Sequence, residues 1–235
     1  MKPLSRCAVA LFGVLSVFSI SSQASDFSIN VGAITVMPDD SSGHLNVVEQ
    51  VAGMPTNSTG AVVNTNTQLG LSVDYRVAPH WQLSLIAATP FAHDIHGSGS
   101  LAGMSIGRTK QLPPTLLVQY HFNDDNAEFN PFVGVGVNYT TFFDEKVDDQ
   151  LGSALVGMGA MQATDNAELA LSSSWGLAFQ AGINWQLSQQ WGVHAMVSKI
   201  AIDTDADVRI NGTTVDSIKV DIDPYVAMLG LRYRF

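Results

Sequence analysis

Residues 175–185 read WGLAFQAGINW, with an apolar side chain at every odd position and a small or polar one between. Alternation with a period of two predicts a β-strand that has one apolar face. The same pattern is clear in residues 69–77 and 225–235. Weaker examples are residues 27–36, 81–88, 115–122, 132–139 and 191–202. These eight segments are close in length to the roughly 9–11 residues that a tilted strand needs to cross a membrane.

The connections between these segments alternate between long and short. Residues 78–80 and 188–190 are short turns, whereas residues 37–68, 140–174 and 203–223 are long connections. Outer-membrane barrels have short periplasmic turns and long extracellular loops. Because an open sheet edge cannot face lipid, the eight strands have to close on themselves. The sequence therefore predicts an all-β fold, an eight-stranded antiparallel up-and-down transmembrane β-barrel in the outer membrane of a Gram-negative cell.

The N-terminus has the pattern of a secretory signal peptide. Two basic residues precede a short apolar run at residues 8–20, and Ser22-Gln23-Ala24 then places small residues on either side of a variable one. This arrangement is what signal peptidase requires, and the apolar run is too short for a membrane anchor. We expect cleavage after Ala24, so that residues 1–24 are a signal peptide and residues 25–235 form the transmembrane barrel.

Cysteine content and charge argue against several classes of protein. Cys7 is the only cysteine, and it would be removed with the signal peptide. The mature chain would then have no thiol for disulfides, zinc sites or catalysis. Cleavage would also remove two of the 11 basic residues and none of the 21 acidic ones, which changes the net charge from −10 to −12. That balance argues against a nucleic-acid partner.

The chain ends on Phe235, which shares the apolar face of its segment with Leu231 and Tyr233. A terminal aromatic residue in this register resembles the signal that the outer-membrane assembly machinery reads. We therefore expect that machinery as a partner, together with outer-membrane lipid and lipopolysaccharide. The acidic cluster at residues 144–149 predicts exposed loop charge, and the alternative is that divalent cations bridge it to lipopolysaccharide.

Several blocks of the sequence resemble the OmpW family of outer-membrane proteins. They are NTQLGL at residues 66–71, AATPF at 87–91, LPPTL at 112–116, PFVGVGVNYTTFF at 131–143, SWG at 174–176, DIDP at 221–224 and YRF at 233–235. The resemblance implies an eight-stranded barrel with a narrow apolar interior that takes up small hydrophobic molecules, and some members of the family serve as colicin receptors. The first long loop, residues 39–65, departs from the family pattern, so a receptor role is not carried over to it.

Strand direction assigns a depth to each residue that faces the lumen. If the short turns are periplasmic, polar side chains gather at the periplasmic end and apolar ones nearer the outside. The predicted polar plug comprises Asp74, Arg76, Gln119, His121, Gln180, Arg232 and Arg234. The predicted apolar cup, which would bind the ligand, comprises Ile34, Val36, Ile86, Ala88, Leu117, Met196, Val226 and Met228. Charges in the plug have to pair if they lie out of water.

The plug and the cup together predict a function. We expect a small hydrophobic solute to enter the cup from outside and to leave sideways through the wall, because the plug closes the floor. A break in strand pairing would permit this exit, and Pro90, Pro113 and Pro114 are candidates for it. Two alternatives remain open. One is ordinary packing of a closed barrel, and the other is a structural or receptor barrel whose loops bind colicin-type or phage-type partners while the lumen is inert.

The motifs that suggest catalysis or metal binding are incomplete. His93 and His96 lie near the outer rim, but the local sequence marks no nucleophile beside them, and a metal would need further ligands. DTDAD at residues 203–207 begins like a calcium loop, yet Val208 stands where that loop needs glycine, so a solvated loop is expected. We predict no enzyme activity, no metal and no cofactor. Residues 151–171 could form a short amphipathic helix over the mouth of the cup, with disorder as the alternative.

Overall fold

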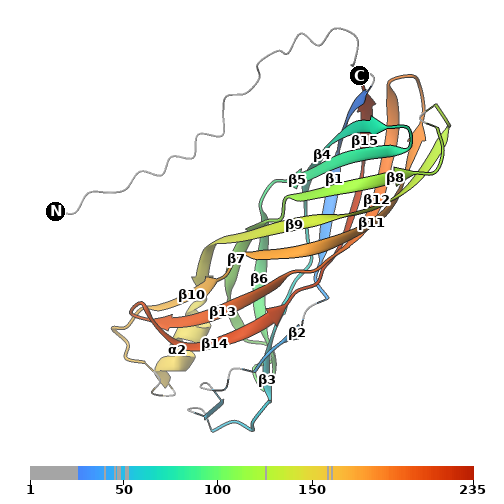
Figure 1. Ribbon diagram of the computed structural model, residues 1–235. Coiled ribbons are helices and arrows are strands. Elements are labelled where there is room, and N and C mark those ends of the chain that lie inside the picture. The colour runs from blue at the N-terminus through green and yellow to red at the C-terminus, as the bar shows by residue number, and fades with distance from the viewer. Residues whose placement is uncertain are drawn as a thin grey trace.

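The computed structural model describes residues 26–39, 41–44, 46, 49–50, 53–124, 126–157, 159 and 161–235. The predicted signal peptide lies outside the described residues. Eight antiparallel strands form a closed barrel, and the last strand pairs back onto the first (Figure 1). In order around the barrel they are β1 (Phe27–Met37), β4 (Asn66–Ala78), β5 (Trp81–Ala88), β8 (Thr115–His121), β9 (Phe129–Val147), β11 (Ser174–Gln186), β12 (Trp191–Ile200) and β15 (Tyr225–Arg234). The predicted fold class is confirmed.

The barrel closes along the seam between β1 and β15. These strands pair continuously from Ser28 opposite Arg234 to Met37 opposite Tyr225. The closed ring gives each barrel strand a neighbour on both sides, which the bilayer demands because it offers no water to unpaired backbone groups. The approach is close enough that a side chain at Gly32 would collide with the backbone of β15.

The two faces of the barrel strands differ as the alternation predicts. On β11, Leu177 and Phe179 point outward and are exposed, whereas Ala178 between them is buried in the lumen. On β15, Leu229 is 62% exposed and Met228 is 2% exposed. A continuous apolar band of this kind is far larger than the patches that water-soluble proteins expose. It is the surface that meets lipid.

Aromatic side chains border the apolar band at both ends. At the end that carries the short turns, Trp81 packs edge-on against Tyr120, with ring centroids 5.1 Å apart. At the opposite end, the rings of Tyr139 and Trp175 lie 4.7 Å apart. Rings of this type favour the boundary between hydrocarbon and water. The two levels therefore mark where the membrane begins and ends along the barrel.

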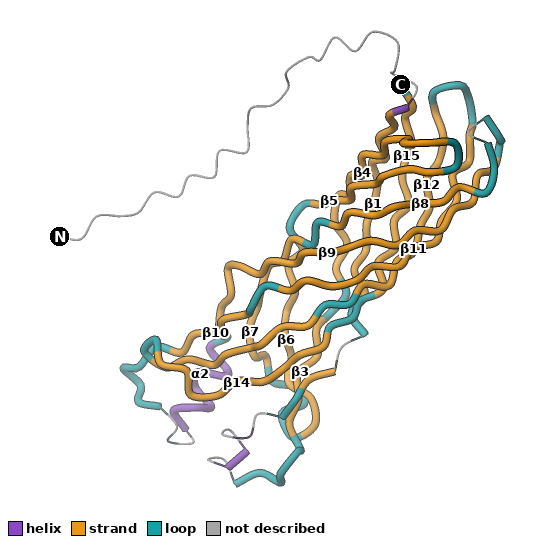
Figure 2. The backbone as a smooth tube through the Cα atoms, in the orientation of Figure 1, coloured by secondary structure: helices purple, strands orange, loops and turns teal. Residues whose placement is uncertain are grey.

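The long connections are themselves folded and contain strands of their own (Figure 2). Two hairpins stand on the barrel, one formed by β6 (Phe91–Gly99) and β7 (Ser105–Leu112), the other by β13 (Asp203–Ile210) and β14 (Thr213–Asp221). Three shorter strands add to their edges: β3 (Thr59–Val63) on β6, β10 (Ala167–Leu171) on β13, and β2 (Ser41–Ser42) on β14. We call this extension the extracellular chamber.

The β13–β14 hairpin shows why residues expected to form a loop form strands instead. In DTDAD the aspartates face outward, while Thr204 and Ala206 face inward and are buried. The turn is made by Asn211 and Gly212, whose φ angles are 51° and 78°. An Asn-Gly pair with both φ angles positive suits the tight turn of a hairpin. The stretch that begins like a calcium loop is therefore one strand with a charged outer face.

Strand β9 and helix α2 connect the chamber to the barrel. β9 pairs with β8 and β11 in the membrane and with β7 farther out. Helix α2 (Asp149–Gly157) follows it at the far end of the chamber, with Leu151 and Leu155 buried. A short amphipathic helix was expected within residues 151–171, and α2 begins two residues before that segment. Among the described residues, no helix is long and apolar enough to cross a membrane.

Candidate functional site

A hydrogen-bonded cluster around Asp74 fills the lumen near the short turns. The Asp74 carboxylate is 1% exposed and accepts hydrogen bonds from Arg232 at 2.8 Å, Asn30 at 2.8 Å and Ser84 at 2.7 Å. Arg232 also donates to the side-chain carbonyl of Asn30 at 3.3 Å. A buried ion pair is stable only when its remaining lone pairs and protons find partners. Strands β1, β4, β5 and β15 supply those partners here.

A second layer crosses the lumen beside this ion pair. Gln119 on β8 donates to the side-chain oxygen of Gln180 on β11 at 2.7 Å, and His121 lies 3.3 Å from the side-chain oxygen of Gln119. The ring of Phe132 stacks between His121 and His194, with centroid distances of 5.0 and 5.6 Å. Polar side chains and one aromatic ring therefore occupy the barrel interior at this depth, as expected for only eight strands.

Five of the seven predicted plug residues lie in these two layers. The other two, Arg76 and Arg234, are half-buried at the rim, where Arg234 donates to the backbone carbonyl of Gln189 at 3.0 Å. Sequence reasoning missed Phe132. Alternation along β9 places it on the same face as Gly134, which faces the lumen. We use the term polar plug for the two layers and this rim.

The predicted apolar cup lies beyond the plug, on the side of the chamber. Six of its eight residues line a narrow apolar cavity, which we call the inner cavity. Its walls are Ile34, Val36, Ile86, Ala88, Met196 and Val226, with Ala87, Phe91, Pro113, Thr115, Ser198 and Ile200. The remaining two members, Leu117 and Met228, are buried in the lumen but do not line the cavity.

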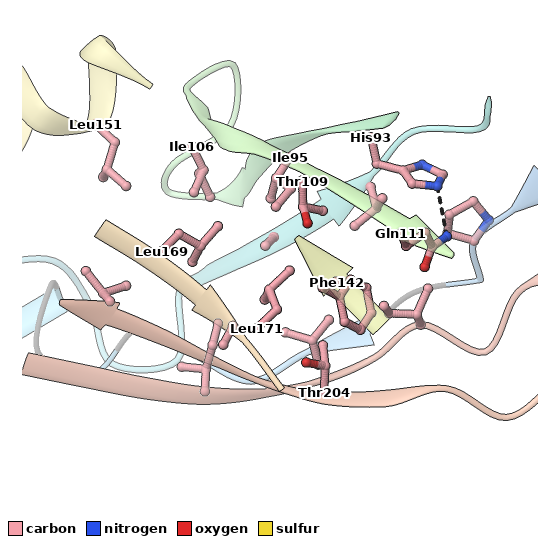
Figure 3. Close-up of a pocket in the computed structure, with 18 of the residues that line it drawn as sticks. His93, Ile95, Ile106, Thr109, Gln111, Phe142, Leu151, Leu169, Leu171 and Thr204 are labelled. Carbon is pink, nitrogen blue, oxygen red and sulfur yellow. Dashed lines mark hydrogen bonds between the residues drawn. The ribbon is translucent and has the colours of Figure 1, made fainter. Parts of the chain in front are cut away.

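A larger cavity lies inside the extracellular chamber (Figure 3). We call it the outer cavity. Its lining is Pro38, Ala61, Val63, His93, Ile95, Ile106, Thr109, Gln111, Phe142, Leu151, Leu155, Leu169, Leu171, Thr204, Ala206, Val208, Ile218, Val220 and Ile222. This lining contains no acidic residue, no lysine and no arginine. Sequence reasoning missed the cavity, and the signal that could have found it is the inward Thr-Ala-Val alternation of β13.

One layer of side chains separates the two cavities along β6. Phe91 lines the inner cavity, His93 lines the outer one, and their rings stack at 6.3 Å. His93 Nδ1 lies 2.7 Å from the backbone carbonyl oxygen of Asn64, and its Nε2 lies 3.0 Å from the amide nitrogen of Gln111. Burial lowers the pKa of His93, and the hydrogen bond to Asn64 opposes this only in part. The imidazole is therefore neutral at neutral pH.

His93 and His96 do not share a site. Three residues apart on one strand, they point to opposite faces, so that His93 is buried in the chamber wall and His96 is exposed. Within the part of the chain that the structure describes, no three His, Cys, Asp or Glu side chains gather closely enough to hold a metal ion.

The wall of the barrel is interrupted beside the inner cavity. Pairing between β5 and β8 extends outward as far as Ile86, and the β6–β7 hairpin resumes regular pairing only at Phe91. The predicted exit residues Pro90, Pro113 and Pro114 lie between these two levels. Proline has no backbone N–H, so these positions cannot donate the hydrogen bonds that would continue the ladder.

A closed eight-stranded barrel with an apolar outer band, aromatic borders and a filled lumen defines a small β-barrel protein of the outer membrane. A sequence model of the OmpW family matches residues 23–235, and the chain belongs to the OmpW family. One relative, outer membrane protein W of Vibrio cholerae serotype O1, is 37% identical over 97% of this chain and 98% of its own length.

Solved structures of relatives have the same barrel. The crystal structure of outer membrane protein OprG from Pseudomonas aeruginosa matches with a TM-score of 0.75 and 38% identity, covering 90% of this chain and 96% of that one. The NMR solution structure of Escherichia coli outer membrane protein W matches with a TM-score of 0.56 and 33% identity, covering 92% of this chain and all of that one. The protein is an outer-membrane barrel of a Gram-negative bacterium.

Proposed function

We propose that the protein is a passive route by which small hydrophobic molecules pass through the outer membrane. The solute enters the outer cavity from the extracellular side and moves into the inner cavity. It then leaves sideways into the hydrocarbon of the bilayer, because the polar plug closes the axial path toward the periplasm. The observation that carries this proposal is the position of two apolar cavities in series above a filled polar lumen.

The outer cavity supports the entry step because it is an apolar space held outside the membrane. The β-strands of the chamber cover its walls, and α2 contributes Leu151 and Leu155 to its lining. Burial of apolar surface stabilises a hydrophobic molecule by about 25 cal/mol for each Å² removed from water. A solute arriving from water therefore partitions into the chamber before it meets the polar lipopolysaccharide layer that would otherwise exclude it.

The interrupted wall supports the exit step. Pro113 lines the inner cavity on one side of the interruption, and Ala87 and Ala88 line it on the other. Pairing between β5 and β8 ends at Ile86 and Thr115, so fewer backbone hydrogen bonds hold the two sides of the wall together beyond this level. The outward-facing residues on either side are apolar, with Leu85 and Leu116 exposed toward lipid. A solute that leaves here moves from one apolar environment into another.

Uptake of an apolar fluorescent dye by cells that express the protein tests this route. Ala206→Phe fills the outer cavity, and Ile86→Lys places a charge in the inner cavity, so each is expected to abolish most of the protein-dependent uptake. Ala92→Phe is the matched control, because Ala92 is the β6 neighbour of His93 and points away from the cavity. Folding of each variant is verified by its heat-dependent migration in electrophoresis. Unchanged uptake in folded Ala206→Phe and Ile86→Lys would favour a structural or receptor barrel with an inert lumen.

The partners predicted from the ends and loops remain part of this proposal. Phe235 is exposed beside Tyr233, with ring centroids 5.0 Å apart, as a signal for the assembly machinery has to be. In the acidic cluster, Asp144 is paired with Lys110 at 2.8 Å and Lys146 at 3.4 Å. This pairing favours ordinary exposed charge over a cation bridge to lipopolysaccharide. Deleting Phe235 is expected to reduce insertion into the outer membrane without changing synthesis.

A further inference from the structure

The outer cavity contains one buried polar atom that has no partner among the described residues. Gln111 lies on the inward face of β7 and is 2% exposed. Its amide nitrogen lies 3.0 Å from His93 Nε2, while no hydrogen bond reaches its side-chain oxygen. An unsatisfied buried acceptor is costly, and native proteins contain few of them. Such an atom in the wall of a binding cavity indicates the position of a ligand group.

The orientation of the Gln111 amide follows from a chain of three groups. The backbone carbonyl of Asn64 can only accept, so His93 Nδ1 carries the hydrogen that fills the 2.7 Å contact. The neutral imidazole then presents Nε2 as an acceptor, and Gln111 must turn its NH₂ toward it. The oxygen of Gln111 is left on the other side, and Figure 3 shows it turned away from His93. The acceptor is therefore fixed by its surroundings.

The two hydroxyl groups in the lining also present acceptors to the cavity. Thr204 directs its hydrogen to the backbone carbonyl of Ser172 at 2.8 Å. Thr109 directs its hydrogen to the backbone carbonyl of Lys110 at 3.4 Å. Thr204 Oγ1 also lies 3.4 Å from the hydroxyl oxygen of Ser172. The side-chain oxygen of Gln111 is therefore the acceptor in this lining that has no partner among the described residues.

The charge of the lining restricts the ligand further. Among the described residues, no acidic residue, lysine or arginine lines the outer cavity, and the one histidine in the lining is neutral. A carboxylate would enter without a cation or a free donor, and an ammonium ion would enter without a counter-charge. Burial of an unpaired charge is strongly unfavourable. The cavity therefore fits a neutral molecule.

We propose that the outer cavity selects neutral hydrophobic molecules that carry a hydroxyl group, which donates to the side-chain oxygen of Gln111. The ligand class is apolar alcohols and phenols, preferred over hydrocarbons, ethers and carboxylates of the same size. This inference rests on the proposed function, since it names the class of solute that the same route admits. The apolar body occupies the space between β7, β10 and β13, and the hydroxyl group faces the layer that separates the two cavities.

A matched pair of ligands isolates the hydroxyl hydrogen. 2-Naphthol donates a hydrogen bond, whereas 2-methoxynaphthalene has the same ring and oxygen without that hydrogen. Binding of each to the full chain in lipid nanodiscs is measured by ligand fluorescence, with the signal from empty nanodiscs subtracted. We expect 2-naphthol to bind about five- to tenfold more tightly. Gln111→Met should remove this preference while still binding the ether, and Gln189→Met in an exposed turn should retain it.

The outcomes distinguish the two proposals. Equal binding of both ligands by the wild-type protein would overturn the hydroxyl selection and leave the uptake route standing. Binding of neither ligand would overturn both. A folded Gln111→Met variant that keeps the preference, or that loses both ligands, would show that Gln111 does not select the ligand through a hydrogen bond to its hydroxyl group.

A measurement on the wild-type protein covers the case in which Gln111→Met does not fold. The side-chain amide resonance of Gln111 should shift more on addition of 2-naphthol than on addition of 2-methoxynaphthalene, because only 2-naphthol donates a hydrogen bond to it. A shift of the same size with both ligands would overturn the proposal.

Discussion

The periplasmic half of the barrel and the extracellular chamber are built from strands with the same alternation, but their interiors are filled differently. In the plug, Asp74 is held by Arg232 and by neutral donors from neighbouring strands. In the chamber, polar groups are few and the interior is left partly empty, with Gln111 presenting an unfilled acceptor. Strand pairing thus provides the same scaffold in both regions, and the inward residues decide whether the interior is filled or left partly empty.

The largest effect is expected from breaking the ion pair of the plug. Asp74→Ala leaves the charge of Arg232 buried without its partner, which should lower the free energy of unfolding by about 3–5 kcal/mol. Urea unfolding in lipid vesicles measures this change. Asp39→Ala is the matched control, because it breaks the exposed Lys199–Asp39 pair at 2.9 Å and should cost no more than about 1 kcal/mol. Equal losses in the two variants would show that the plug does not depend on its buried charges.

A second variant removes the layer between the two cavities. Phe91→Ala deletes a fully buried ring and should lower the free energy of unfolding by about 3 kcal/mol. Because it joins the outer and inner cavities, it should also speed the uptake of bulky apolar dyes. Phe179→Ala, on the lipid-facing side of β11, is the control for loss of a ring outside the lumen. Slower uptake in folded Phe91→Ala would mean that the ring guides the solute.

The contact between α2 and the chamber tests whether the chamber opens independently of the barrel. Leu155→Ala removes a buried side chain from the helix and should destabilise its docking by about 2 kcal/mol. Hydrogen exchange should become faster in α2 and at the chamber end of β7 but stay unchanged in the membrane strands. Ser153→Ala on the exposed side of the same helix serves as the control. Faster exchange throughout the barrel would show that the two regions open together.

The smallest effect is expected from acidification. The pKa of His93 in the folded chamber is below its usual value of 6.5 because the ring is buried. The opened chamber therefore binds the proton more readily than the closed one, and closure weakens as the pH falls from 6.5 toward the lowered pKa. The protection factors of β6 and β7, which correct hydrogen exchange for its intrinsic pH dependence, should fall over that range and be independent of pH above it. His93→Gln should remove the dependence, and an unchanged dependence would assign it to another group.

The barrel could be predicted from sequence because lipid imposes a simple rule on every strand. Outward residues such as Leu177 and Phe179 must be apolar, so alternation reveals both the strands and the lumen face. The polar plug was predicted from the same alternation, because Asp74 and Arg232 fall on inward positions. Its exact pairings could not be read, because they depend on which residues of distant strands lie at the same level.

The chamber could not be predicted, because its outer face meets water. There the inward positions hold small, weakly hydrophobic residues such as Thr204 and Ala206, and aspartates lie between them. This composition equally fits a solvated loop. The contact between His93 and Gln111 also depends on how β6 and β7 are aligned, and that hairpin contains a register shift next to His96. A shift of one residue would have turned both side chains to the outer face.

Of the eight barrel strands, β9 alone extends from the periplasmic rim into the chamber, over 19 residues from Phe129 to Val147, with a register shift in its pairing with β7. On the side of Pro90, Pro113 and Pro114, the chain crosses the same level without a continuous strand. In the sideways exit that we propose, the end of pairing between β5 and β8 at Ile86 and Thr115 would set the flank of the barrel from which the solute leaves.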